Sequence, residues 1–202
     1  DQSTKLGFYR NIPKPVRIGD YQVLFLPLVT SATVRVECSI QGGHWGDAPG
    51  KAGATHLLEH MVASAWKGCK NSLCPGLAKR GVMTNALVSS EYSSYFATGR
   101  SEDTGVMLDY LANIVVRPRL TKSALARERK VVRAELLRHL SNPTRAVTDA
   151  LSKLIYSARR HQSLSPREML RVLPTLTLRD VERALHRTHS APCMLFAISG
   201  KY

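Results

Sequence analysis

The sequence lacks any hydrophobic run long enough to cross a membrane. A spanning helix needs about 20 consecutive apolar residues, whereas the longest apolar stretch, residues 23–29, has the length of a strand and is interrupted by Pro27. Apolar residues nevertheless make up 44% of the 202 residues, which is enough for one substantial core. We therefore predict a globular chain without a transmembrane segment, folded as a single domain over residues 1–202.

Cysteine is also scarce. The four cysteines, Cys38, Cys69, Cys74 and Cys193, are too few for a disulfide scaffold. Cys38 and Cys193 lie in strand-like apolar segments and are expected to be small core residues. Cys69 and Cys74 flank a mostly polar turn, and the sequence does not decide whether they form a local disulfide. Their spacing fits a zinc site poorly because no second cysteine pair accompanies it.

Acidic residues are few beside the basic ones. The chain has 15 Asp and Glu against 29 Lys and Arg, a net charge of +14, and the excess is larger in the second half of the chain. Such a positive field attracts acidic peptides, nucleic acid or an anionic membrane surface, although a solvated basic surface or a face for an acidic partner explains it equally simply. No aromatic residues interleave with the arginines as stacking platforms, so nucleic acid is not a favoured partner.

Hydrophobic periodicity gives the order of the expected elements. Residues 32–40 alternate between polar and apolar side chains, which predicts a strand with one buried face. Further strands are expected at 21–26, 82–88, 92–98 and 192–199. Helical spacing predicts helices at 53–65, at 107–115 (ended by Pro118), and at 123–140, 144–157 and 177–188. The order predicts an α+β fold, with a largely antiparallel sheet and helices packed on one side.

Two histidines one helical turn apart stand in the segment His56-Leu57-Leu58-Glu59-His60. Because positions i, i+3 and i+4 of a helix share a face, His56, Glu59 and His60 are expected to project together. Two neutral imidazoles so placed can both bind one Zn²⁺ at about 2.0–2.1 Å, while the carboxylate between them can take a proton from water. Histidine pairs on apolar helices more often simply pack or face solvent, but the added glutamate favours a zinc site.

Such a site needs one further protein ligand. The expected helix 123–140 carries Glu128 and Glu135, which lie nearly two turns apart along one face. The alternative is intrahelical pairing, worth only about 0.2–0.5 kcal/mol per pair. Glu135 has Arg138 at i+3 for such a pair, whereas Glu128 has no basic residue at i±3 or i±4. The residue pattern alone leaves both glutamates as candidates.

The pattern His-x-x-Glu-His is the signature of the inverted zincins, and its surroundings resemble the pitrilysin and mitochondrial processing peptidase family. The resemblance covers roughly residues 20–200. It includes the metal helix at 53–61, the glycine–asparagine–alanine strand at 81–86, the serine–glutamate–tyrosine pattern at 89–95, the paired-glutamate helix at 128–135 and the final strand at 198–200.

The resemblance implies a role for each residue of the motif. His56, His60 and Glu135 would be the zinc ligands, and Glu59 would be the general base. Glu128 would steady a ligand histidine, since a carboxylate behind a ligand imidazole fixes its tautomer and orientation. The implied activity is that of a zinc metalloendopeptidase.

The substrate of the family is an extended peptide. By the resemblance, Asn85 and Ala86 would lie on an edge strand that pairs with the peptide. Active members have a second half that supplies an arginine and a tyrosine, and nothing in this chain matches that element. We therefore expect a second homologous domain or subunit as partner. The segment Gly43-His44-Trp45-Gly46 also departs from the arginine–glutamate stretch common at this point.

Two other functions compete with the peptidase. The family includes core subunits of a respiratory complex that lost their zinc motifs, so a non-catalytic scaffold subunit of a larger mitochondrial complex is the alternative; the complete ligand set favours the enzyme. The basic helices motivate an RNA-associated subunit as a third option. The mitochondrial matrix is slightly favoured over a periplasmic or secreted location, and a start at Asp1 fits either a removed targeting segment or a trimmed chain.

Overall fold

A computed structural model describes residues 13–66, 74–156 and 165–202. Within these residues six strands form one mixed sheet in the order β1-β2-β6-β3-β5-β4, in which only β2 and β6 run parallel. The strands are β1 (Val16–Ile18), β2 (Tyr21–Pro27), β3 (Val34–Gln41), β4 (Met83–Val88), β5 (Tyr92–Gly99) and β6 (Met194–Gly200).

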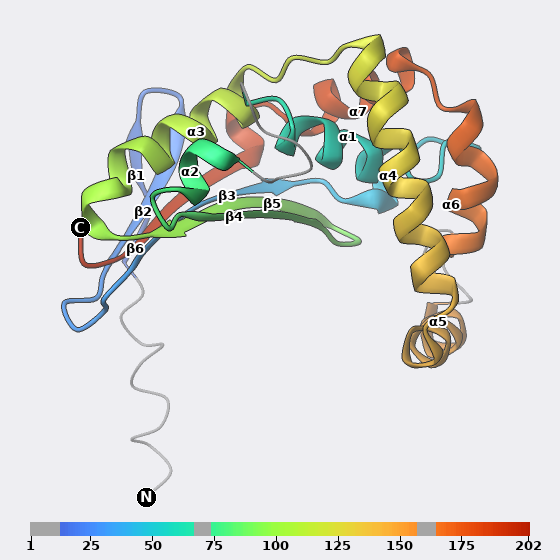
Figure 1. Ribbon diagram of the computed structural model, residues 1–202, viewed down its shortest axis with the longest axis horizontal. Helices are drawn as coiled ribbons and strands as arrows, with labels where there is room; N and C mark the ends of the chain where they lie inside the picture. The colour runs from blue at the N-terminus through green and yellow to red at the C-terminus, as the bar shows by residue number, and fades with distance from the viewer. Residues whose placement is uncertain (1–12, 67–73, 157–164) are drawn as a thin grey trace, which may run out of the picture.

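The helices lie mainly over one face of this sheet, with α3, α1 and α7 above it and α4 and α6 at one end (Figure 1). Helix α5 extends from the end of α4 and projects beyond the sheet. The helices are α1 (Ala54–Ala63), α2 (Pro75–Ala78), α3 (Thr104–Val116), α4 (Lys122–Leu140), α5 (Pro143–Tyr156), α6 (Pro166–Val172) and α7 (Leu178–Thr188).

The core lies between the sheet and these helices. Every second residue of β3 is buried, in agreement with the predicted alternation, and these residues are Val34, Val36, Cys38 and Ile40. They share one hydrophobic cluster with the buried residues of α1, which include Leu57, Leu58, Met61 and Val62. Helix α1 is therefore fixed against the sheet along most of its length, and it also packs against α4 and α7.

The predicted α+β fold with a largely antiparallel sheet and helices on one side is confirmed. The sequence analysis did not predict three short elements, β1, α2 and α6. Their signals are local, such as Ser165, which caps α6 ahead of Pro166 at the first helical position. The last strand begins at Met194 rather than at residue 192, because residues Ala191–Cys193 form a 3₁₀ turn.

None of the described helices is long and apolar enough to span a membrane. The cysteines follow the sequence expectations only in part. Cys38 is buried and Cys193 is half-buried, and both are free thiols. Cys74 is disulfide-bonded, whereas Cys69, its proposed partner, lies outside the described residues.

Candidate metal centre

The start of α1 is held by a buried carboxylate. Asp47 accepts hydrogen bonds from the backbone N–H groups of Gly53 (2.9 Å) and Thr55 (3.0 Å), which would otherwise lack a partner in the first helical turn. Arg187 of α7 donates to the Thr55 hydroxyl at 2.7 Å and lies 3.7 Å from the Asp47 carboxylate. This network fixes the rotation of α1 immediately before His56.

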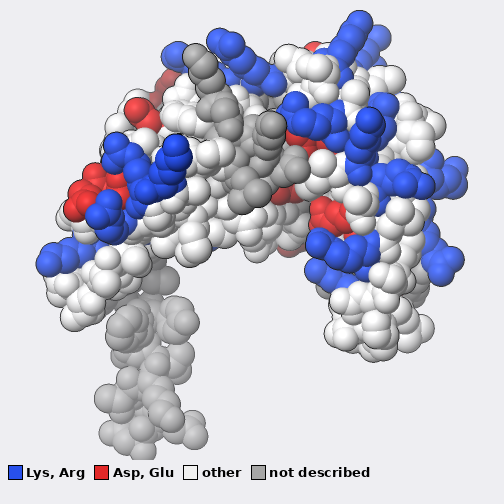
Figure 2. Space-filling model, in the orientation of Figure 1, with Lys and Arg blue, Asp and Glu red and all other residues white. Residues whose placement is uncertain are grey.

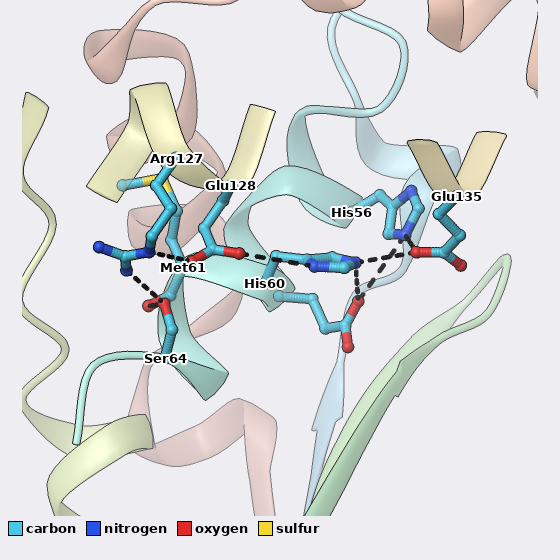
Figure 3. Close-up of polar contacts among 8 residues, drawn as sticks. His56, His60, Met61, Ser64, Arg127, Glu128 and Glu135 are labelled. Carbon is cyan, nitrogen blue, oxygen red and sulfur yellow. Dashed lines mark hydrogen bonds and ion pairs between the residues drawn. The ribbon is translucent and has the colours of Figure 1, made fainter. Parts of the chain in front are cut away.

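His56 and His60 project from α1 toward Glu135 of α4 (Figure 3). The ligand atoms of His56, Glu59 and His60 lie within 4.8 Å of one another, in agreement with the predicted shared face. Glu135 Oε2 lies 3.1 Å from Nε2 of His60 and 3.6 Å from Nε2 of His56. Two ligands of a tetrahedral zinc, each about 2.0–2.1 Å from the ion, are about 3.3 Å apart. Both distances from the Glu135 oxygen to the imidazole nitrogens are therefore close to the spacing of two donors on one zinc.

Glu59 stands slightly apart from these donors. Its Oε2 lies 3.9 Å from the Nε2 atoms of both His56 and His60. Burial raises the pKa of Glu59, and the two histidines oppose this only in part. A carboxylate with a raised pKa beside a candidate metal position is suited to accepting and returning a proton.

His60 and Glu135 perturb each other. Although burial alone would lower the pKa of His60, the hydrogen bond to Glu135 and the nearby carboxylates raise it overall. Hydrogen bonds with His56 and His60 hold the pKa of Glu135 well below its usual range. Each group thus stabilises the charged form of the other, and a bound cation would take over the role of the imidazolium proton.

On the opposite edge of the His60 ring stands Glu128, which is fully buried. Its Oε1 accepts a hydrogen bond from Arg127 Nε at 2.8 Å, and its Oε2 lies 3.9 Å from His60 Nδ1 (Figure 3). Among the described residues, Oε2 has no hydrogen-bond partner. Since a buried acceptor without a partner costs free energy, this oxygen is available to a donating Nδ1–H, the arrangement that would direct Nε2 toward a metal.

Arg127 also joins the two helices. Its Nη2 donates to Ser64 Oγ at 3.2 Å, and Ser64 in turn donates to the carbonyl oxygen of Met61 at 3.3 Å. The end of α1 is therefore tied to α4 next to Glu128. The sequence analysis did not single out Arg127, because an arginine beside a glutamate carries no signal of this contact with Ser64.

A cavity of about 520 Å³ opens beside the histidines. Its wall contains the residues predicted for the site, except the buried Glu128, and also Asn85 and Ala86 of β4. Strand β4 lies at one edge of the sheet, so one of its sides has no neighbouring strand among the described residues. The structure thus brings the predicted peptide-binding residues and the predicted metal residues to one cavity.

Two further histidines line this cavity and were missed by sequence reasoning. His139 Nε2 lies 3.5 Å from Glu135 Oε1, a pair that the i, i+4 spacing could have indicated. His44 lies 3.4 Å from the Ser90 hydroxyl, and burial, aided by the nearby His56, lowers its pKa to about 4. His44 is therefore a neutral polar group in the wall at ordinary pH.

Comparison with known proteins identifies the family of this chain. Residues 24–165 match the sequence profile described as Insulinase (Peptidase family M16). This match covers more than half of the chain, so the chain belongs to the peptidase M16 family, which includes the pitrilysin and processing-peptidase proteins that the motifs resemble.

Curated relatives include both enzymes and assembly subunits. An uncharacterized zinc protease of Bacillus subtilis, YmxG, is 30% identical over 134 residues, which are 64% of this chain and 32% of that protein. Subunit 1 of the mitochondrial cytochrome b-c1 complex of Mus musculus is 29% identical over 84% of this chain and 35% of that subunit. The chain thus spans about a third of the length of these relatives.

Solved structures show the same fold. Pitrilysin superimposes with a TM-score of 0.75 at 18% identity, over 96% of this chain and 22% of that chain. A peptidase M16 inactive domain from Pseudomonas fluorescens superimposes with a TM-score of 0.76 at 16% identity, over 94% of this chain and 46% of that chain. At these identities the likeness shows the fold alone.

Proposed function

We propose that this chain is the zinc-binding catalytic domain, over residues 1–202, of a metalloendopeptidase that hydrolyses extended peptides. In this proposal the zinc ligands are His56, His60 and Glu135, and Glu59 is the general base. The observation that carries it is the closeness of Glu135 to both histidines: its Oε2 lies 3.1 and 3.6 Å from the two imidazole Nε2 atoms. Those distances suit one tetrahedral zinc.

Each neighbouring residue has a task in this reaction. Zinc, when bound, would polarise the scissile carbonyl group and make water a better nucleophile. Glu59 takes a proton from the attacking water and passes it to the leaving amine, for which its raised pKa suits it. Glu128 Oε2, which lies 3.9 Å from His60 Nδ1, would accept a hydrogen bond from that nitrogen once zinc is bound at Nε2, and so keep the ring oriented. The backbone at Asn85 and Ala86 pairs with the extended peptide.

A second homologous domain or subunit completes this site in the proposal. The chain spans 32% of the zinc protease relative and 22% of the pitrilysin chain that it matches, and its cavity is only partly enclosed. Electrostatic stabilisation of the transition state is stronger where water is excluded. A partner that covers the cavity would therefore raise the rate without changing the zinc ligands.

The alternative is a non-catalytic subunit in a larger assembly. It is favoured by the cytochrome b-c1 complex subunit among the relatives and by the inactive domain among the solved structures. In this chain, however, every residue of the proposed zinc site is present, and Glu135 lies within 3.6 Å of both histidines. A scaffold domain would have no need of that arrangement, so the peptidase is the better-supported function.

Zinc analysis of the purified chain tests the proposal directly. We expect one zinc per chain, retained by Glu59→Gln, because Glu59 is not a ligand in this scheme. Glu135→Gln should weaken zinc binding by more than about 100-fold, since the loss of a ligand exceeds the 10–100-fold effect of losing an outer partner. Peptide cleavage should be absent in Glu59→Gln with its zinc in place.

Each possible result separates the two functions. Stoichiometric zinc with cleavage that appears only when a homologous partner half is added supports the split enzyme. A chain that takes up no zinc at a pH where its imidazoles are neutral is a scaffold and not an enzyme. Full zinc affinity in Glu135→Gln would show that the third ligand is a different residue.

A further inference from the structure

The cavity beside the candidate metal centre has a basic side. Two arginines line it beyond the metal residues: Arg138 on α4, one turn after Glu135, and Arg145 on α5. We call Arg138 and Arg145 the basic flank. Lys and Arg side chains gather over α4 and α6 at this end of the molecule, above the mostly white end that α5 forms (Figure 2). The basic flank is thus the part of this charged surface that a bound peptide would meet.

The basic flank has no acidic partner among the described residues. No carboxylate of the described part of the chain lies within ion-pair distance of either arginine. Asp149 also lines the cavity, four residues after Arg145, but it forms no such pair. Both guanidinium groups are therefore available to a negative group that enters the cavity.

The other charged groups at the cavity also leave it with a net positive charge when zinc is bound. Glu59 and Glu135 would interact with the metal and its water. The positive charge of a divalent zinc and two arginines would exceed the negative charge of the three carboxylates that line the cavity. His44 is neutral and contributes a polar group instead of a charge. A positive cavity draws acidic ligands and repels basic ones.

From these observations we infer that the substrates are extended peptides with an acidic side chain, Asp or Glu, close to the scissile bond, where it meets Arg138 and Arg145. This inference rests on the proposed peptidase function and specifies its substrate class. The carboxylate would accept hydrogen bonds from the guanidinium groups, whose planar set of N–H donors matches a carboxylate. No chemical step changes: the basic flank selects the peptide, and the metal centre cleaves it.

Binding of fluorescent peptides to the zinc-loaded Glu59→Gln chain tests the inference without turnover. The peptides form a matched set that differs at one position at a time, which carries Asp, Asn or Lys. At the best position we expect Asp to bind about fivefold more tightly than Asn at physiological ionic strength, because contacts with exposed charges are modest. The advantage should shrink as salt is added.

Variants assign the preference to the basic flank. Arg138→Gln together with Arg145→Gln should bring Asp and Asn peptides to within about twofold of each other. The matched control is Arg117→Gln with Arg119→Gln, which removes the same net charge from two exposed positions outside the cavity. This control should keep the preference. Arg145→Glu should shift the preference toward the Lys peptide.

The outcomes distinguish this inference from the proposed function. A chain that holds zinc and binds peptides without preferring Asp overturns the inference and leaves the peptidase standing. Equal loss of preference in the control pair also overturns it, because the effect would then come from net charge alone. A chain that binds no peptide of the set overturns it as well. Failure to hold zinc would instead contradict the proposed function.

Discussion

The two sides of the cavity are built in opposite ways. On the α1 side the side chains are buried and bonded: Asp47 holds the first turn of the helix, and Glu128 is enclosed beside His60. On the α5 side nearly every described residue is exposed, including Val147 and Leu151, and the arginine of this helix has no ion pair among the described residues. One side is part of the buried core, and the other is a helix whose described residues are nearly all exposed.

This difference matches what each side would have to do. Metal ligands and a general base must be held to within about 0.5 Å of their working positions, which requires packing and hydrogen bonds behind them. Attraction between charges acts over several ångströms and tolerates movement. A rigid α1 side therefore suits chemistry, and an exposed α5 side suits the selection of ligands.

A large effect is expected where the α1 side begins. Asp47→Ala would remove the acceptor for two backbone N–H groups and leave Arg187 without its carboxylate. We expect a loss of about 2–3 kcal/mol in the free energy of unfolding, the usual cost of leaving several buried polar groups unbonded. Thermal unfolding of the zinc-free chain, followed by circular dichroism, measures it. Asp149→Ala on α5 is the control and should change stability by less than about 0.5 kcal/mol. Equal melting temperatures for the two variants would contradict the contrast between the sides.

A smaller and more specific effect is expected at the far end of α1. Arg127→Met would leave Glu128 Oε1 without its donor and free the carboxylate to rotate away from His60. Zinc affinity, measured by competition with a chromophoric chelator, should fall about tenfold, as for other partners behind a ligand histidine. Arg127→Lys should recover part of the loss.

The control for this variant is Lys130→Met, which removes an exposed positive charge from the same helix. It should leave zinc affinity unchanged. Nitrogen chemical shifts of the His60 ring in the zinc-loaded chain give a second measurement, because Arg127→Met should alter the signal of Nδ1 while Lys130→Met should not. Equal zinc affinity in both variants would mean that Arg127 only ties α1 to α4.

The sequence predicted the local part of this arrangement and missed the long-range part. Helical spacing was sufficient to place His56, Glu59 and His60 on one face, because that relation depends on about one turn of a single helix. It could not decide between Glu128 and Glu135. They lie on a similar face of α4, and only the packing of α4 on α1 shows that Glu135 meets the Nε2 atoms while Glu128 is enclosed beside Nδ1.

Sequence periodicity could not predict the contacts that support the site either, because they too depend on how the helices pack. Arg187 and Thr55 are 132 residues apart, and Arg127 and Ser64 are 63 residues apart. Such pairs depend on how α7 and α4 pack on α1, which no local pattern specifies. The sheet order was likewise not predictable from the strands alone, since β6, the last strand, inserts between β2 and β3.

The smallest effect is expected on α5. Leu151 is 55% exposed, so Leu151→Ala would remove little buried apolar surface. We expect a change of less than about 0.5 kcal/mol in the free energy of unfolding. The matched variant Leu58→Ala changes the same residue type on α1, where the side chain is 1% exposed, and should cost about 3 kcal/mol. Urea unfolding of the two variants and the unchanged chain gives both values. A cost at Leu151 close to that at Leu58 would show that α5 is a structural part of this domain, and the proposed division between a rigid catalytic side and an adaptable selecting side would be wrong.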